Sequence, residues 1–398
     1  PKIINIVADS NSIYKNAKIK VIFPKIFSEF AWDEMFWLIF PPNVRAGYTK
    51  IKSKSTNKKG IIQNVTLTND EFPTTPSSAF HYAYQHENNQ KMLTFQMLDT
   101  LPKGDTLQII YGANGTPTFT SNSMVEHADN FVVLIDNQNS GNFDVIEKQP
   151  TIYVKHLVAK SINLVLSSKG NLNNTSLLKV AIHDVGKNVV NDFTGSVQIT
   201  SSDASALTPL IINFNATDKG TKDVYLNFAK KGIYTIKANV LSANQPLTGN
   251  FFSNPINVSN DSFNIYWGEF HTHTKFSRDG FGSDAYSYAR YGAGLDFYSG
   301  TDHMDCNPID TFGINTLEWN ALQSEARLVN EPSRFVSFLG YENSLENPSG
   351  HYNFIFNYKE DSINNIPQFT RYLIPNIKNI WTQLNALNWQ GKMLTIPH

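Results

Sequence analysis

Residues 295–303 read Leu-Asp-Phe-Tyr-Ser-Gly-Thr-Asp-His, a mostly apolar run that ends in polar residues. A short apolar run of this kind is typical of a strand that is buried on both faces. A candidate helix precedes it, capped by Ser283 and ended by Gly292, and residues 315–330 form another candidate helix after it. A buried strand between two helices indicates an α/β domain with parallel strand pairs.

The same alternation continues to the end of the chain. Further strands are predicted at residues 334–341, 352–356 and 392–396, with a helix at 376–389 that Gly391 ends. We therefore predict a barrel-like α/β domain over residues 261–398. Barrels of this type carry their chemistry at the carboxyl ends of the strands.

The histidines of this region lie at the ends of the predicted strands. They are His271, His273, His303, His351 and His398, and Glu342 ends one further predicted strand. His271 and His273 follow a predicted strand at 263–270, and residues two apart on a strand point to the same face. Their imidazoles can therefore reach one ion. This placement favours a metal site over histidines that merely pack in the core.

Imidazole and carboxylate ligands in one site suit zinc, manganese or iron. A carboxylate such as Glu342 can bridge two ions, and paired ions activate water and bind the oxygens of an in-line phosphoryl displacement. We therefore predict a cluster of two or three divalent transition-metal ions. Glu342 and His303 are the predicted catalytic residues.

Residues 267–280 read Trp-Gly-Glu-Phe-His-Thr-His-Thr-Lys-Phe-Ser-Arg-Asp-Gly, and together with 295–303 they resemble motifs of the polymerase-and-histidinol-phosphatase (PHP) superfamily. Three later segments resemble further motifs of the superfamily: Gly340-Tyr-Glu342, Gly350-His-Tyr-Asn353 and Ile396-Pro-His398. Within the superfamily the chain is most similar to the DUF3604 family, in which a β-rich region precedes this domain. The resemblance runs from Tyr266 to His398 and implies a trinuclear metal cluster in a distorted seven-stranded α/β barrel.

The resemblance also implies which residues bind the ions. His271 and His273 would bind the first ion, His351 and His398 the second, and Asp279 and His303 the third. Glu342 would bridge ions of the cluster. The chain departs from the pattern at Glu269, where the family usually has aspartate, and this side chain is expected to orient a ligand. The superfamily's last two ligands, an Asp-x-His pair, would follow on a strand after His398. We therefore expect this chain to be a truncated part of a longer protein, since a barrel that ended at His398 would have open edges. Completion by another chain and a defective site are the alternatives.

Charged and reactive neighbours of these ligands have simpler interpretations. Lys275 and Arg278 follow the His-Thr-His motif and are predicted to attract an anionic substrate, a small or polymeric phosphoester; the alternative is solvated loop charge. Asp302 is expected to orient His303 or to cap the strand end. Cys306 is expected to be a buried small residue.

The first two thirds of the chain show the pattern of β-sandwich modules. Alternating runs such as 92–97 and 106–111, broken by turn residues at 102–105, predict a sandwich over residues 1–150. Further alternating runs at 178–183, 195–200 and 231–238 predict an immunoglobulin-like sandwich over residues 151–260. The histidines of these modules are scattered, which favours structural or surface roles.

The composition excludes some classes of protein. Charged residues make up 17% of the 398 residues and the formal net charge is −1, so no broad attraction to nucleic acid or to an anionic membrane is expected. The longest apolar run, residues 35–40, is far short of the roughly 20 residues that span a bilayer. The single cysteine excludes an intrachain disulfide. An Asn-, Ser- and Thr-rich composition favours an extracellular, periplasmic or cell-surface location, with self-association through the β modules.

These observations together predict a metal-dependent hydrolase, a phosphoesterase carried behind two β modules. A metallohydrolase acting on a non-phosphate ester or an amide is the nearest alternative, because a fold does not fix a substrate. A surface or assembly protein with a degenerate metal-binding barrel is a further one. The absent Asp-x-His pair favours the degenerate barrel, and the seven ligands that are present oppose it.

Overall fold

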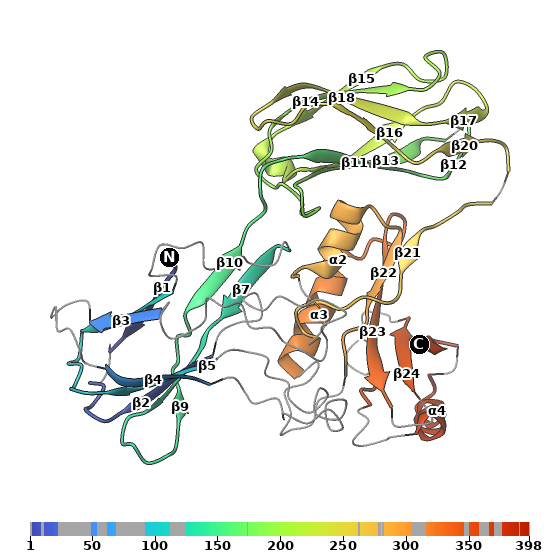
Figure 1. Ribbon diagram of the computed structural model, residues 1–398. Helices are drawn as coiled ribbons and strands as arrows, with labels where there is room; N and C mark the ends of the chain where they lie inside the picture. The colour runs from blue at the N-terminus through green and yellow to red at the C-terminus, as the bar shows by residue number, and fades with distance from the viewer. Residues whose placement is uncertain are drawn as a thin grey trace, which may run out of the picture. The chain divides into compact units, whose positions relative to one another are not determined.

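The structure is a computed structural model. It describes residues 2–8, 12–22, 49–53, 62–68, 92–111, 124–172, 174–261, 263–277, 280, 282–304, 316–345, 350–357, 366–369, 376–389 and 391–397. Over these residues the chain forms mainly β-strands, with few helices. It folds as two compact units, the first mainly from residues up to Val154 and the second mainly from Lys155 onward (Figure 1). The boundary predicted near residue 260 falls inside the second unit and stays a prediction.

The first unit is built from antiparallel sheets. One has the order β1 (Lys2–Val7), β6 (Thr106–Tyr111), β3 (Thr49–Ser53). The second has the order β4 (Ile62–Thr68), β5 (Met92–Met97), β2 (Lys18–Ile22), β8 (Val132–Asp136), β9 (Asp144–Val145). A further pair joins β10 (Thr151–Val154) to β7 (Glu126–Asn130). On β2, Ile19 and Val21 are fully buried, while Lys18 and Lys20, which alternate with them, are not, so the period of two places every second side chain in the core.

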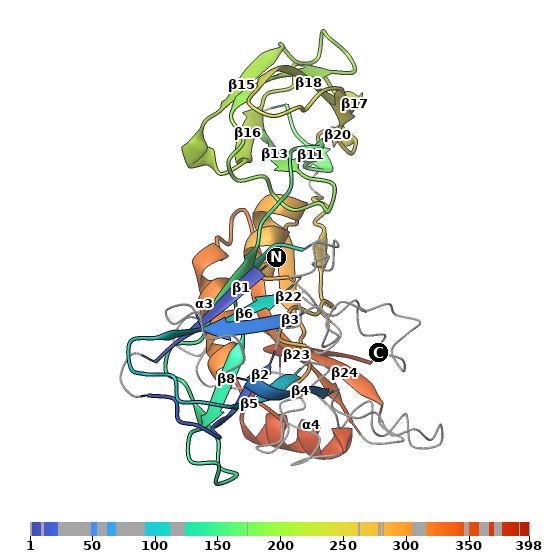
Figure 2. The same cartoon turned by 60° about the vertical axis from the view of Figure 1, so that its left-hand side comes forward.

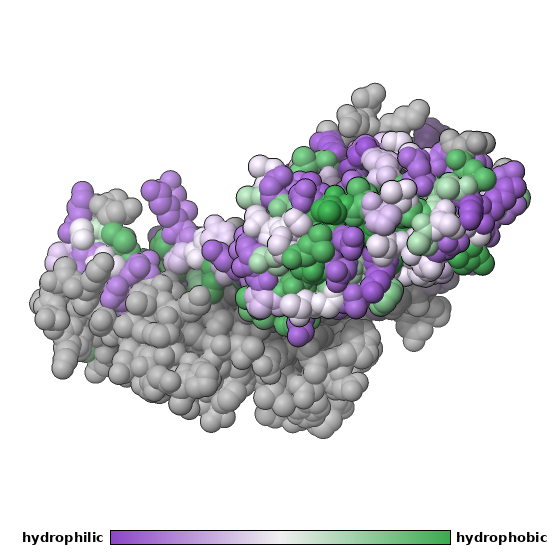
Figure 3. All heavy atoms as spheres, turned by 90° about the horizontal axis from the view of Figure 1, so that it is seen from above, coloured by the Kyte–Doolittle hydropathy of each residue, from purple (hydrophilic) through white to green (hydrophobic). Residues whose placement is uncertain are grey.

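The second unit begins with a β-sandwich over residues 155–260. Its sheets have the orders β11 (Ser161–Leu166), β13 (Ser176–His183), β16 (Thr221–Leu226); β15 (Leu210–Phe214), β14 (Gly195–Ser201), β18 (Ile236–Ala243), β19 (Asn250–Phe252); and β12 (Lys169–Gly170), β20 (Ile256–Val258), β17 (Gly232–Tyr234). Its core includes Leu178, Phe193, Val197 and Ile236, all fully buried. Hydrophilic and hydrophobic residues are interspersed on the face that Figure 3 shows.

One predicted strand of this sandwich proves to be two. The run 231–238 divides into β17 and β18, which belong to different sheets. The change of sheet occurs at Thr235, whose carbonyl accepts a hydrogen bond from the Ser202 amide at 2.9 Å. The backbone stays extended on both sides of this point, so the alternation of side chains gives no sign of the crossing.

The C-terminal part of the second unit contains one five-stranded sheet. Its order is β21 (Gly268–Glu269), β22 (Phe297–Gly300), β23 (Val336–Ser344), β24 (His351–Phe356), β25 (Met393–Pro397). Its helices are α2 (Ala285–Ser287), which continues into the π-helix η6 (Tyr288–Ala293), α3 (Thr316–Val329) and α4 (Ile377–Ala386). Figures 1 and 2 show β22, β23 and β24 side by side. Within the described residues, no helix is long and apolar enough to cross a membrane.

The strand directions correct the expectation of a (β/α) barrel. β21, β22 and β23 pair in parallel as expected, but β24 pairs antiparallel with both β23 and β25. Only residues 345–350 separate β23 from β24, and so short a connection cannot make the crossover that a parallel pair needs. The described strands therefore form an open mixed sheet.

The two faces of this sheet differ in what covers them. One face carries Tyr341 and Phe354, whose rings stack 5.3 Å apart between centroids, and Tyr341 also contacts Trp319 of α3. The other carries Phe297 and Phe338, with ring centroids 6.5 Å apart. Glu342 follows Phe338 by four residues on β23 and so lies on this second face.

A buried lysine joins the sandwich to the sheet. The Lys179 ammonium on β13 donates to the carbonyl of Leu295 at 2.5 Å and to that of Gly294 at 3.1 Å, and lies 3.2 Å from Asp296 Oδ1. The Lys179 side chain is 9% exposed. These acceptors lie in the turn that leads into β22, so the lysine fixes the start of that strand.

We expect Lys179→Met to lower the free energy of unfolding of the second unit by about 2–4 kcal/mol, because Asp296 and two carbonyls lose a charged donor. Urea titration checks this. The matched control is Lys222→Met, which breaks the more exposed pair with Asp218 at 2.8 Å and should cost less than about 1 kcal/mol. Equal losses in the two variants would show that Lys179 does not couple the sandwich to the sheet.

The start of helix α2 is capped from another helix. Asp284 precedes α2 with a left-handed backbone and makes no capping hydrogen bond through its side chain. Glu325 of α3 replaces that cap, since its Oε1 accepts from the amides of Tyr286 at 2.9 Å and Ser287 at 3.2 Å. Burial, with the charges of Asp284 and Asp302, raises the pKa of Glu325 to about 7.

A carboxyl whose pKa is higher in the folded than in the unfolded state costs stability when it ionises. Stability is therefore fully retained below about pH 4.5, falls as the pH rises from about 4.5 to about 7, and changes no further through this group above the folded-state pKa. Glu325→Gln keeps an oxygen for the two amides and removes the charge. We expect it to stabilise the second unit by about 1–2 kcal/mol at pH 8 and by almost nothing at pH 4.5. Thermal unfolding at both pH values checks this, and a gain that is independent of pH would contradict it.

Candidate metal centre

Glu342 is positioned by the middle strand of the five-stranded sheet. β23 runs to Ser344, so Glu342 lies inside this strand and does not end it as predicted, because pairing with β24 continues through Ser344 and His351. Beyond β22 the parallel pairing continues as a bridge between His303 and Glu342. The Glu342 amide donates to the carbonyl of Asp302 at 3.0 Å. The end of β22 and the middle of β23 therefore bring His303 beside the carboxylate.

The His-Thr-His motif reaches the same place through a fixed loop. The predicted strand 263–270 is reduced to β21, so strand alternation does not account for the two imidazoles. Glu269 Oε1 accepts hydrogen bonds from the amides of Phe270 at 2.8 Å and His271 at 2.9 Å. Thr272 exchanges backbone and side-chain hydrogen bonds with Thr301, which follows β22. The loop is thereby attached to the carboxyl end of the neighbouring strand.

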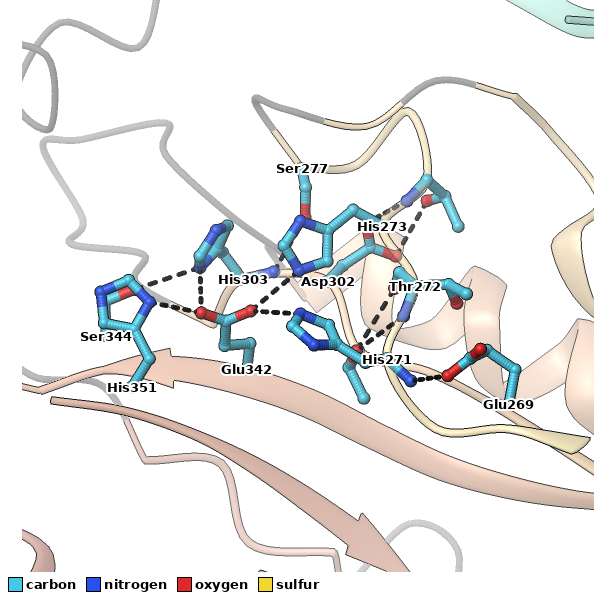
Figure 4. A network of polar contacts seen from close by, with 12 residues as sticks. Glu269, His271, Thr272, His273, Ser277, Asp302, His303, Glu342, Ser344 and His351 are labelled. Atoms are coloured by element: carbon cyan, nitrogen blue, oxygen red, sulfur yellow. Dashed lines mark hydrogen bonds and ion pairs between the residues drawn. The ribbon is translucent and has the colours of Figure 1, made fainter. Parts of the chain in front are cut away.

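Four imidazoles surround the Glu342 carboxylate (Figure 4). Oε2 lies 3.1 Å from His271 Nε2 and 2.9 Å from His273 Nε2. Oε1 lies 2.6 Å from His351 Nδ1 and 3.8 Å from His303 Nδ1. The Glu342 side chain is 1% exposed, whereas those of His271 and His351 are 33% and 29% exposed, so the cluster opens to solvent at these two imidazoles.

The neighbouring imidazoles favour the ionised form of the Glu342 carboxyl. Burial on its own raises the pKa of this carboxyl, but hydrogen bonds from His273 and His351 lower it, as does the charge of His303 and His273. The net result is a pKa well below the usual range for glutamate. The carboxylate is therefore anionic at every pH at which the protein would work, which is what a metal ligand requires.

The donor set fits a transition-metal ion. One ligand atom from each of His271, His273 and Glu342 can be chosen so that all lie within 4.8 Å of one another. Around a tetrahedral zinc ion with bonds of about 2.0–2.2 Å, ligand atoms lie roughly 3.3–3.6 Å apart. The observed distances of 2.9 and 3.1 Å from Oε2 are shorter by a few tenths of an ångström. A small outward shift of the imidazoles would admit an ion.

Hydroxyl side chains that the sequence analysis did not single out support this set. Ser277 Oγ accepts from the His303 amide at 2.8 Å, and Ser344 Oγ lies 3.2 Å from His303 Nδ1. Asp302 accepts from the amide and the hydroxyl of Thr274, at 2.6 and 2.9 Å, so it holds the loop after His273. The sequence could have pointed to Thr274, Ser277 and Ser344 only by their position, since each lies within four residues of a predicted ligand.

Some of the predicted site residues cannot be placed. Arg278, Asp279 and His398 lie outside the described residues, as does Cys306. Lys275 is described, and its ammonium lies 5.9 Å from the centroid of the Phe276 ring. Its amide donates to the carbonyl of Gly282 at 3.2 Å, which closes the loop after the His-Thr-His motif.

Comparison with known proteins gives a family match for part of this region. Residues 296–398 match the family model described as "Protein of unknown function (DUF3604)". No curated protein matches the chain. Among solved structures, the pilus adhesin SpaC of Lactobacillus rhamnosus GG in its open conformation is similar at 10% identity and a TM-score of 0.20, and the match covers 67% of this chain and 27% of the adhesin. At that TM-score the likeness carries no argument about this chain.

We expect zinc or manganese to raise the Tm of chelator-treated protein by roughly 5 °C or more at saturating concentration, because the ion binds only the folded state. Replacing both His271 and His273 by alanine should abolish the shift. The control is His156→Ala, which removes an imidazole of the sandwich that contacts Asn191 and should leave the shift unchanged. Differential scanning fluorimetry measures all three proteins, and an equal shift in the double variant would exclude this metal centre.

Proposed function

We propose that the C-terminal part of the chain, from about residue 261, is a metal-dependent hydrolase that acts on phosphoesters. The observation that carries the proposal is the convergence of imidazoles from three separate segments on both oxygens of one buried carboxylate. Such a group is costly to bury for stability alone, and mixed imidazole and carboxylate donors suit transition metals.

The sequence motifs support membership of the PHP superfamily. The motif residues His271, His273, His303 and His351 meet at Glu342, and part of the same region matches the DUF3604 family model. The motifs support this proposal independently of a closed barrel, because the described strands form an open sheet.

The residues of the chain have distinct proposed roles. His271, His273, His303, Glu342 and His351 would hold two or three zinc, manganese or iron ions. Such ions, when bound, activate water and neutralise the charge that develops on a phosphoryl group. Glu342 contributes a permanent negative charge through both oxygens, and Ser277 fixes the backbone of His303. Lys275 would attract the anionic substrate from the loop beside the opening.

Glu342→Gln should lower the turnover of p-nitrophenyl phosphate or its bis-ester by the full-length protein ~100-fold or more, because an amide cannot bridge two ions. Lys275→Ala should instead raise KM more than it lowers kcat, because it removes attraction without changing the ligand set. Steady-state kinetics at saturating metal measures both variants.

Two outcomes would separate the alternatives. Full activity of Glu342→Gln with unchanged metal content would overturn the bridging role and the mechanism with it. Metal binding without turnover of any phosphoester, carboxylic ester or amide would favour a degenerate domain in a surface or assembly protein.

A further inference from the structure

Asn353 has a buried oxygen for which the described protein offers no hydrogen-bond donor. The residue is 2% exposed, and its Oδ1 is one of two buried side-chain polar atoms without a hydrogen-bond partner among the described residues. The other is Oδ1 of Asn343. A buried polar group normally has a partner, because leaving it without one costs about 1–3 kcal/mol. An unexplained exception therefore points to a missing partner.

The register of the sheet places Asn353 on the same face as the imidazole cluster. Asn353 is directly opposite Glu342 in the antiparallel pair of β23 and β24, and Ser344 is directly opposite His351. Directly opposed residues point to one face of a sheet, with Cβ atoms roughly 4.5–5.5 Å apart. Asn353 also follows His351 by two residues, which again places both on one face. Asn353 is thus a direct neighbour of two residues of the metal centre.

Asn343 provides the contrast on the other face. It follows Glu342 by one residue, so its side chain points away from the cluster. Its Nδ2 donates to the carbonyl of Phe369 at 2.7 Å, and the neighbouring Tyr341 hydroxyl donates to the carbonyl of Pro367 at 3.0 Å. Asn343 therefore has a structural role in attaching residues 366–369 to the sheet. No comparable contact within the described residues accounts for Asn353.

We propose that Asn353 is a further residue of the metal centre and that its side-chain oxygen coordinates the ion. This inference rests on the proposed metal site and extends it by one neutral oxygen donor. Carbonyl oxygens suit the harder ions of the predicted set, manganese above all. The residue would thus favour manganese relative to zinc, which prefers nitrogen and sulfur ligands.

The test compares Asn353→Leu with Asn353→Asp in the full chain, with manganese as the probe. Leucine has nearly the same shape and no oxygen, so it should weaken manganese binding at least 10-fold. It should also raise the Tm of the metal-free protein by about 2–5 °C, since it removes a buried polar atom without a partner. Aspartate keeps an oxygen and should bind manganese within about threefold of the parent. Isothermal titration calorimetry measures affinity, and scanning fluorimetry measures Tm.

The matched control is Asn343→Leu, which removes a similarly buried amide from the neighbouring strand β23, on the opposite face of the sheet. It should leave manganese affinity unchanged. Unchanged affinity in Asn353→Leu, an equal loss in Asn353→Asp, or an equal loss in Asn343→Leu would each overturn the role of Asn353. If the parent protein itself binds no manganese or zinc, the proposed metal centre fails, and this outcome is distinct from a failure of Asn353 alone.

Discussion

The second unit is organised around the cost of burying one negative charge. A carboxylate that is 1% exposed is stable only if donors surround it, and the donors of Glu342 come from segments far apart in the sequence. Through these contacts Glu342 joins the loop after β21, the end of β22 and the start of β24. Hydroxyl groups of Thr274, Ser277 and Ser344 then hold these backbones in place. The geometry of the site therefore reflects one electrostatic constraint, within a sheet whose strand directions are set by the lengths of its connections.

Local patterns in the sequence predicted the elements well, because each element depends on neighbouring residues. The strand 92–97 agrees with β5 (Met92–Met97), and the helix 315–330 differs by one residue at each end from α3 (Thr316–Val329). Which strands pair, and in which direction, was harder to predict from the sequence. The split at Thr235 and the antiparallel direction of β24 depend on which sheet receives the chain, and no periodicity records that. A barrel was the natural expectation from alternation alone, and it was wrong for the described strands.

For the candidate site too, the sequence indicated which residues matter but not how they contact one another. The motif positions of His271, His273, His303, Glu342 and His351 identified residues that do converge. The sequence could not reveal that Glu269 and Asp302 act on backbone amides, because such hydrogen bonds depend on the path of the loop. Asn353 belongs to the motif at residues 350–353, but its position opposite Glu342 depends on the strand register, which the sequence does not give. Arg278, Asp279 and His398 lie outside the described residues.

The residues of the site differ in how far they lie from Glu342 along the chain, because β23 and β24 are joined by a short connection. His351 is nine residues from Glu342 in the sequence, whereas His271 is 71 residues away. A hairpin closes a short loop at little entropic cost, while the His-Thr-His loop must be recruited across a long intervening chain. Half of the cluster can therefore form as soon as one hairpin does. The other half depends on docking of the His-Thr-His loop and of the end of β22, so these contacts would be lost first when the protein opens locally.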